Sequence, residues 1–304
     1  MSEAGGPNGG GNRGTQDRPK RREGDRKTQS VREAIRTELA SDVSSRAEAE
    51  RPADRPQGGR PRSVIELSHV HLAFDVPILE DVSFTAFEGE TVAVVGESGT
   101  GKSTILKLLL RLLVPERGTV CIDGQDITGL SFDEALRVRQ KMGMVFQGAA
   151  LFDSMTVFEN VAYPLREHTD MNEDEIEARV REKLEFVDLE PERVMEQYPA
   201  ELSGGMRKRV GIARGMANNP EIMLYDEPTS GLDPLTTNTI TRLIKKLQRE
   251  LGVTSVVVSH DMDSVNRMAS KIALLHDKHI SFFGPPEEMM ASEDRYIREF
   301  IGAL

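Results

Sequence analysis

The sequence predicts an α/β fold with a largely parallel β-sheet, because short apolar runs alternate with segments of helical periodicity. The apolar runs are rich in β-branched residues, which is typical of strands buried on both faces. The strands of the parallel sheet are expected at residues 91–95, 142–146, 222–225 and 254–258. Further strands are expected at residues 63–67 and 82–87, and a hairpin at 272–275 and 280–283.

Two segments between these strands have the periodicity of amphipathic helices. One begins after Asn172, which has the spacing of a capping box with Glu175. Its apolar face consists of Ile176, Val180, Leu184 and Val187. The apolar face of the other helix consists of Ile240, Leu243, Ile244 and Leu247.

Composition excludes several classes of protein. The chain has 304 residues with one cysteine and no tryptophan, so a disulfide framework and a cysteine zinc site are excluded. The longest apolar stretch, residues 105–114, is interrupted by Lys107 and Arg111. It is also shorter than the roughly 18 residues of a membrane span. No signal peptide is expected, because no charged segment followed by an apolar one opens the sequence.

Charge is unevenly distributed along the chain. Residues 1–62 hold 14 Lys and Arg against 10 Asp and Glu, whereas the remaining residues hold 25 against 40. An acidic body of this kind argues against nucleic acid as a partner. Residues 1–62 contain no aromatic residue and are rich in Gly, Pro and charged side chains, which predicts a disordered N-terminal tail.

The most specific motif follows the strand expected at residues 91–95 and opens a helix expected at 103–113. It matches G-x-x-x-x-G-K-[ST], the phosphate-binding loop. Its residues are Gly96, Glu97, Ser98, Gly99, Thr100, Gly101, Lys102, Ser103 and Thr104. The glycines let backbone N–H groups point at phosphate oxygens, and the helix N-terminus adds partial positive charge. Lys102 is expected to neutralise β- and γ-phosphate charge, and Ser103 to bind Mg²⁺.

Two carboxylates end the strand expected at residues 222–225. Asp226 and Glu227 then lie at the carboxyl edge of the sheet, beside the phosphate loop. We expect Asp226 to hold Mg²⁺, directly or through water. We expect Glu227 to act as the general base toward the attacking water.

A third motif lies between these two in the chain. Ser203, Gly204 and Gly205 have the composition of a helix N-cap whose N–H groups and dipole can bind an anion. Alone this is a weak signal. Its position between the phosphate loop and the carboxylate strand strengthens the prediction that it binds an anion.

Together these motifs resemble the ATP-binding cassette (ABC) family of ATPases. The matching segments follow the family order: the phosphate loop, Gln147, residues 202–206, the carboxylate strand, residues 230–233 and His260. The resemblance covers about residues 63–284 and implies a P-loop NTPase fold with an antiparallel β subdomain and a helical subdomain near 149–218. Residues 285–304 are then expected as a C-terminal extension with an amphipathic helix.

The resemblance implies roles for residues of the chain's own nucleotide site. Phe74 corresponds to the aromatic residue that stacks on adenine, although packing in the core is an alternative for it. Gln147 corresponds to the glutamine that senses Mg²⁺ and the attacking water, although an ordinary polar strand end is an alternative. His260 corresponds to the histidine that hydrogen-bonds the γ-phosphate.

Other roles implied by the resemblance involve a second protomer. Ser203 and Gly205, with Gly204 between them, would contact the γ-phosphate of ATP held by the opposite protomer. Asp233 would link the two sites across the dimer. One chain carries one cassette, so the resemblance implies a homodimer or a partner cassette.

One residue of the segment 202–206 differs from the usual family sequence and indicates a branch of the family. Met206 stands where the family more often has glutamine, and Lys208 and Arg209 follow it. With residues 148–168, this resembles the lipid-transport branch, the Mce-associated cassettes related to the ATPase of the maintenance-of-lipid-asymmetry system. The branch implies a peripheral ATPase on the cytoplasmic face of the inner membrane that powers phospholipid transport. Its partners would be an integral-membrane, MlaE-like permease and an Mce-domain lipid-binding protein.

In the family, the segment after the glutamine forms the groove that receives a helix of the permease. Leu151, Phe152 and Phe158, with Asp153 and Glu159 at the rim, suit such a groove. Ordinary core of the helical subdomain is the alternative interpretation.

Three other functions stay open at this stage. An importer of another solute, such as an amino acid, would use the same chemistry with another permease. A cassette ATPase of translation or DNA repair is disfavoured, because such members carry two cassettes or a long coiled-coil insert. A regulatory module without turnover is disfavoured because both Glu227 and His260 are present.

Overall fold

The computed structural model describes residues 61–302, so the predicted disorder of residues 1–62 falls, except for its last two residues, outside the described range. Six strands of this part form one sheet in the order β10-β9-β3-β8-β7-β6. Their bounds are β3 Thr91–Val95, β6 Met142–Val145, β7 Ile222–Asp226, β8 Thr254–Val258, β9 Lys271–His276 and β10 His279–Gly284. All neighbours pair in parallel except β9 and β10, which form the expected hairpin.

A second sheet of four antiparallel strands has the order β2-β1-β4-β5. Its strands are β1 Ser63–Ala73, β2 Pro77–Phe87, β4 Arg117–Ile122 and β5 Gln125–Asp126. β1 extends well beyond the apolar run at 63–67, and its pairing with β2 shifts register between Leu67 and Val70, where His69 has a φ of 52°. A parallel sheet joined to an antiparallel one confirms the predicted α/β fold class.

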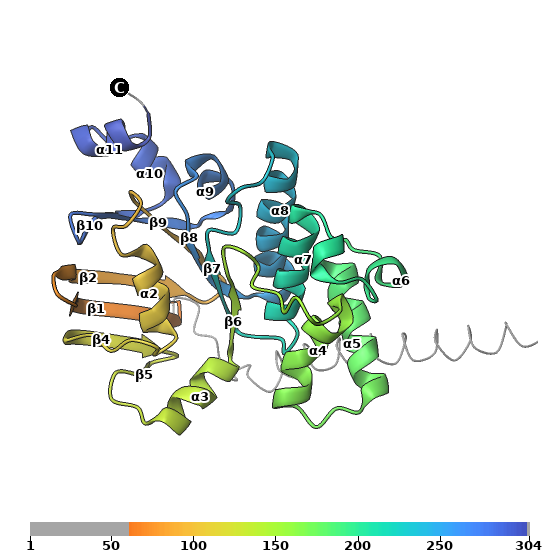
Figure 1. Ribbon diagram of the computed structural model, residues 1–304. Helices are drawn as coiled ribbons and strands as arrows, with labels where there is room; N and C mark the ends of the chain where they lie inside the picture. Colours follow the sequence, from red (N-terminus) through yellow and green to blue (C-terminus); the bar gives the residue numbers. More distant parts are fainter. Residues whose placement is uncertain (1–60, 303–304) are drawn as a thin grey trace, which may run out of the picture. The chain divides into compact units, whose positions relative to one another are not determined.

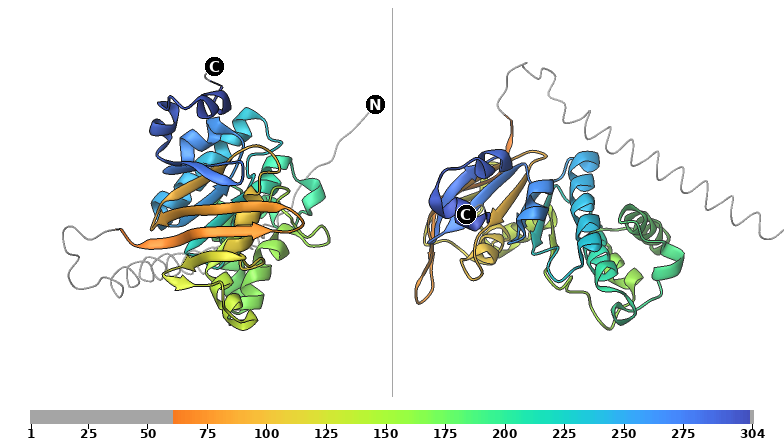
Figure 2. Two further views of the ribbon diagram at one scale, coloured as in Figure 1. Left: turned by 90° about the vertical axis from the view of Figure 1, so that its left-hand side faces the viewer. Right: turned by 90° about the horizontal axis from the view of Figure 1, so that it is seen from above.

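Helices cover both faces of the parallel sheet (Figures 1 and 2). Helix α2 (Lys102–Leu109) packs in one core cluster with Val92 and Val94 of β3. Helices α7 (Gly204–Gly215) and α8 (Pro234–Leu251) pack in the other cluster with Ala93 and Val95. Successive residues of a strand point to opposite faces, so α2 and α7 lie on opposite sides of the sheet.

The remaining described helices before β9 are α3 Phe132–Gln140, α4 Val157–His168, α5 Glu173–Phe186, α6 Pro191–Val194, a 3₁₀ turn η1 Pro199–Glu201 and α9 Met262–Met268. The capping box predicted at Asn172 and Glu175 is confirmed at the start of α5. A matching box of Thr156 and Glu159 begins α4. None of the helices in residues 61–302 has both the length and the hydropathy needed to cross a bilayer.

The C-terminal part forms two short helices, α10 (Pro286–Met290) and α11 (Arg295–Phe300), in place of the single amphipathic helix expected there. Met289 and Ile297 are buried in the same core cluster as Ile272 and Leu274 of β9. The ring of Tyr296 stacks on His276 at a centroid distance of 3.5 Å. This extension therefore packs on the end of the parallel sheet.

Candidate functional site

The phosphate loop joins the buried end of β3 to the N-terminus of α2, as the motif predicted. Gly96, Gly99 and Gly101 have φ values of 152°, 82° and 104°. At Gly96 a side chain would collide with the carbonyl oxygen of Leu275, and at Gly101 a Cβ would lie 2.9 Å from Ile78. Only glycine therefore fits both the backbone conformation and the space at these two positions.

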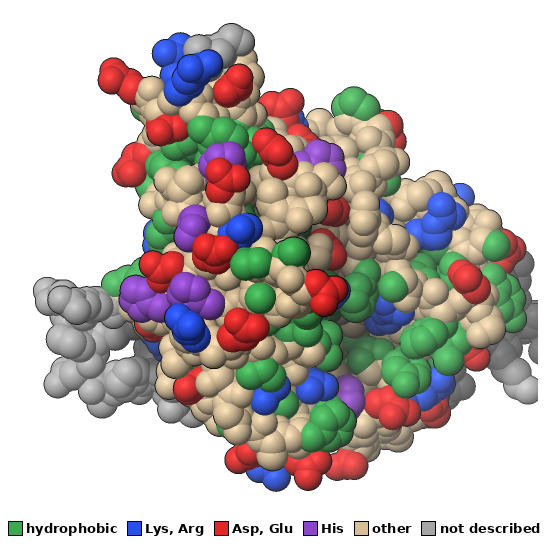
Figure 3. Space-filling view, turned by 60° about the vertical axis from the view of Figure 1, so that its left-hand side comes forward, with side chains coloured by type: hydrophobic (Ala, Val, Ile, Leu, Met, Phe, Trp, Pro, Cys, Tyr) green, Lys and Arg blue, Asp and Glu red, His purple; other side chains and the backbone are tan. Residues whose placement is uncertain are grey.

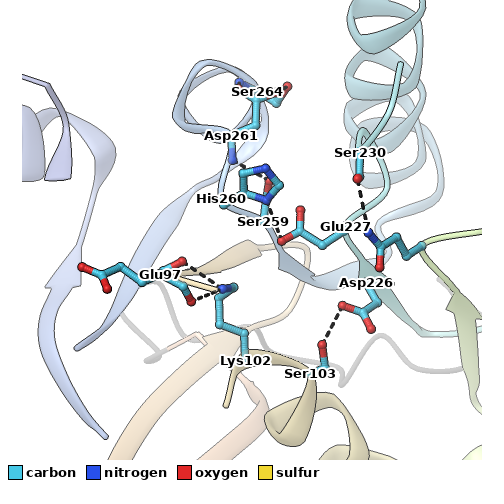
Figure 4. Close-up of polar contacts among 12 residues, drawn as sticks. Glu97, Lys102, Ser103, Asp226, Glu227, Ser230, Ser259, His260, Asp261 and Ser264 are labelled. Atoms are coloured by element: carbon cyan, nitrogen blue, oxygen red, sulfur yellow. Dashed lines mark hydrogen bonds and ion pairs between the residues drawn. The ribbon is translucent and has the colours of Figure 1, made fainter. Parts of the chain in front are cut away.

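The ammonium group of Lys102 lies under this loop (Figure 4). Its Nζ donates to the carbonyl oxygen of Gly96 at 2.8 Å and to that of Glu97 at 2.6 Å. Burial lowers the pKa of Lys102, while the carboxylates of Glu227 and Asp226 act in the opposite direction. A cation therefore lies where the backbone N–H groups of the loop would hold phosphate.

Ser103 and Asp226 meet beside the loop. Ser103 Oγ, at the start of α2, donates to Asp226 Oδ1 at the end of β7 over 3.0 Å. A hydroxyl and a carboxylate are hard oxygen donors of the kind that Mg²⁺ binds together with phosphate oxygens. Two of the three residues predicted at the Mg²⁺ thus come together and fit the ion.

Glu227 and His260 form a second pair next to the first. His260 Nδ1 lies 2.9 Å from Glu227 Oε1, in an arrangement in which the ring N–H donates to the carboxylate. Glu227 Oε2 is buried and has no hydrogen-bond partner among the described residues. Because a buried acceptor without a partner is costly, this oxygen fits a bound water. Glu227 also has a φ of 48°, an unfavourable conformation for a non-glycine residue that concentrates at functional sites.

Gln147 lies two residues past the end of β6. Its Nε2 donates to Ser230 Oγ at 3.3 Å, and its own carbonyl oxygen accepts from Lys208. The structure therefore brings Gln147 to the loop that follows Glu227, and its contact with Mg²⁺ stays a prediction. The sequence did not predict Ser230 and Lys208 as contacts of Gln147, although Ser230 lies within the segment 230–233 and Lys208 follows the segment 202–206.

The motif at residues 203–205 lies at the N-terminus of α7. Ser203 is the N-cap and accepts from the amide of Met206 at 3.3 Å. A side chain on Gly205 would collide with Thr236 of α8. No hydrogen bond described for Ser203 reaches the phosphate loop of the same chain, which agrees with α2 and α7 covering opposite faces of the sheet.

Asp233 and Phe74 are the remaining predicted site residues. Asp233 caps α8, and its pKa is lowered by the Thr236 hydroxyl and by the amides of Thr236 and Leu235. Phe74 lies between β1 and β2 with 62% of its surface exposed, which rules out the core alternative for it. Its ring is accessible to a planar base, and stacking on adenine stays a prediction.

Comparison with protein families agrees with this geometry. The family model described as ABC transporter matches residues 79–230, which include the phosphate loop, the residue 203–205 motif and both carboxylates. The chain belongs to the ABC transporter family, as its ATPase domain.

Two curated relatives illustrate the range within the family. The probable ribonucleotide transport ATP-binding protein mkl of Mycobacterium tuberculosis is 42% identical over 224 residues, covering 74% of this chain and 62% of the relative. The chain thus spans about three fifths of the length of that relative. The intermembrane phospholipid transport system ATP-binding protein MlaF of Escherichia coli K12 is 40% identical over 227 residues, covering 75% and 84%.

A solved structure shows the same fold. It is described as a dimeric post-hydrolysis state of the ATP-binding cassette MJ0796 bound to ADP and Pi. Its TM-score is 0.68 at 37% identity, over 73% of this chain and 98% of that chain.

Proposed function

We propose that this chain binds ATP with Mg²⁺ and hydrolyses it, as the ATPase subunit of a bacterial ABC transporter. The observation that carries the proposal is the meeting of two pairs, Ser103 with Asp226 and Glu227 with His260, beside the phosphate loop. Bound Mg²⁺ would neutralise phosphate charge in the site.

Each side chain then has a distinct part in hydrolysis. Ser103 and Asp226 hold the cation, and Lys102 exchanges the carbonyls of Gly96 and Glu97 for phosphate oxygens. Glu227 accepts the proton of the attacking water through its unpaired Oε2. His260 orients Glu227 and donates to the γ-phosphate when nucleotide is present.

We also propose that the working unit contains two copies of the chain, arranged head to tail. The residue 203–205 motif lies on the face of the sheet away from α2, so it has no phosphate to contact in its own chain. A C2 dimer would place the motif of each protomer over the phosphate loop of the other. The dimeric state described for the MJ0796 cassette supports this arrangement.

For the cargo, we propose phospholipid or another lipid carried between bacterial membranes. The support is the similarity to MlaF, the methionine at position 206 and the segment 148–168. The partners would then be an MlaE-like permease and an Mce-domain lipid-binding protein, with the ATPase peripheral at the cytoplasmic face of the inner membrane.

The surface that would receive the permease is exposed and apolar. The exposed rings of Phe152 and Tyr163 are tilted against each other with centroids 5.2 Å apart, and Arg214 lies over Phe152. Figure 3 shows hydrophobic side chains gathered beside a hollow on the helical side of the molecule. Of the three predicted groove residues, Phe152 is exposed, whereas Leu151 and Phe158 are partly buried against the core, so the segment is in part core. An apolar helix of a permease is the occupant that such a surface suits.

A small-solute importer is the second candidate, because the mycobacterial relative is named for ribonucleotide transport. The test is gentle-detergent purification of the tagged chain from its host, followed by mass spectrometry of proteins and lipids. A permease with an Mce-domain protein and phospholipid supports the proposal. A permease with a solute-binding protein supports the second candidate, and ribosomal or DNA-repair proteins without a membrane protein contradict transport altogether.

A further inference from the structure

Lys208 is a buried lysine to which the hydrolysis proposed above assigns no role. It lies in α7, one turn beyond the residue 203–205 motif, and only 6% of its surface is exposed. Its Nζ donates to the carbonyl oxygen of Gln147 and, at 3.2 Å, to that of Glu227. One side chain thus binds the main chain of two residues expected to act in hydrolysis.

The two carbonyls lie where strands β6 and β7 end. β6 and β7 pair in parallel up to Val145 and Tyr225, and β7 stays paired with β8 up to Asp226 and the amide of Glu227. Glu227 and Ala149 have φ values of 48° and 63°, so the backbone turns sharply at both places. Carbonyl oxygens outside a ladder need other donors. Lys208 donates to the carbonyl of Gln147 and to that of Glu227, which also accepts from the amide of Ser230 at 3.2 Å.

The charge of Lys208 is directed to the main chain. Among the described residues, no carboxylate oxygen lies within ion-pair distance of its Nζ. Burial lowers the pKa of Lys208, and the carboxylates of Glu227 and Asp226 act in the opposite direction. The same causes act on Lys102. Two buried ammonium groups, one on α2 and one on α7, therefore flank the carboxylate pair.

We infer that Lys208 is a positioning residue for ATP hydrolysis, which ties the main chain of Gln147 and Glu227 to α7; the inference rests on the proposed function. Ser203 caps the same helix, so a displacement of this motif moves Lys208 and the two carbonyls with it. In the head-to-tail dimer, Ser203 meets the partner's nucleotide while Glu227 meets the nucleotide of its own chain. Lys208 then connects the two ATP sites through a single helix.

The test compares two substitutions of Lys208 in the full-length chain. Lys208→Met keeps the hydrocarbon stem and removes all donors, whereas Lys208→Arg keeps donors of the same charge. We expect Lys208→Met to lower kcat about 10- to 100-fold, because a displaced base and sensor lose the reactive geometry. KM for ATP should stay within about twofold, because the phosphate loop is untouched. Lys208→Arg should recover most of kcat.

A matched control comes from Lys183, another buried lysine of the helical segment. Its Nζ donates to Asn219 Oδ1 at 2.6 Å and to Glu182 Oε1 at 2.9 Å, in a place without nucleotide chemistry. Lys183→Met should lower the melting temperature and leave kcat of the folded protein unchanged. Equal kcat losses in the Met variants of Lys183 and Lys208 would show that Lys208 contributes only to the stability of the fold.

A second readout does not depend on turnover. In a Glu227→Gln background, Lys208→Met should still form the ATP-bound dimer in light scattering. Loss of that dimer would mean that Lys208 only stabilises the structure of the residue 203–205 motif. A wild-type chain without any ATPase activity contradicts the proposed function. Wild-type turnover with unchanged kcat in Lys208→Met contradicts only the role of Lys208.

Discussion

Replacing Glu227 with glutamine tests the assignment of the base with little change in shape. Glu227 Oε1 accepts from His260 at 2.9 Å, and an amide oxygen at that place would still accept. Oε2 has no partner among the described residues, so an amide nitrogen there breaks no hydrogen bond of the fold. Glu227→Gln should therefore fold as the wild type does and lose only the proton acceptor.

The expected loss follows from the role of a general base. Such a group contributes about 10²- to 10⁴-fold to the rate, which corresponds to about 3–5 kcal/mol of transition-state stabilisation. Affinity for ATP should stay equal or rise, because the substitution removes a negative charge from beside the triphosphate. The variant should also accumulate as an ATP-bound dimer.

The assays are phosphate release at saturating MgATP, calorimetry of ATP binding and light scattering. The matched control is Glu221→Gln, just before β7, where Glu221 is exposed and lies 3.9 Å from Lys141 in a surface ion pair of little energetic weight. It should leave all three measurements unchanged. Turnover of Glu227→Gln within about tenfold of the wild type would refute the base assignment.

Other substitutions test the phosphate loop and the packing around the site. Lys102→Met should weaken ATP binding about 10- to 100-fold, and unchanged affinity in calorimetry would exclude Lys102 as a phosphate ligand. Asn160→Ala removes the side-chain hydrogen bonds to the amide of Phe152 and to the carbonyl of Met155, so the free energy of unfolding should fall by about 1–3 kcal/mol in denaturant titration. Stability equal to wild type would contradict a structural role for that amide. Met289→Ala should destabilise by about 2–5 kcal/mol because Met289 is buried in the core. Met290→Ala, at a half-exposed position, should not, and equal effects would argue against docking of the C-terminal extension on the sheet.

The elements predicted well from sequence are those whose residues are uniformly buried. β3 and β8 have the bounds that their apolar runs predicted, because all five residues of each strand are buried. β1 was predicted too short, because beyond Leu67 polar residues alternate and a bulge at His69 breaks the pattern. The strand β4 was missed because it begins with the polar sequence Arg117-Gly118-Thr119.

Helix α4 was missed although a signal was present. Pro164 inside the helix obscures its periodicity, while Thr156 and Glu159 have capping-box spacing. The C-terminal segment was expected as one helix, but the chain turns after Met290 and Asp294 caps a second helix.

For the site, the sequence predicted which residues matter but not how they pair. Local motifs specify the phosphate loop and the carboxylate pair, because each lies on one strand end or one helix start. The contacts of Gln147 with Ser230 and Lys208 depend on the parallel pairing of β6 with β7 and on the docking of α7. No spacing along the chain encodes those contacts, so only the three-dimensional structure reveals them.

The central claim is that each ATP site is made by two chains. The most direct test mixes a chain carrying Lys102→Met with a chain carrying Ser203→Arg, each inactive alone. In a head-to-tail heterodimer, one site keeps an intact phosphate loop from one chain and an intact residue 203–205 motif from the other. Half of the dimers in an equal mixture are such heterodimers, so activity should return to about a quarter of wild type. A mixture as inactive as its components would contradict the composite site.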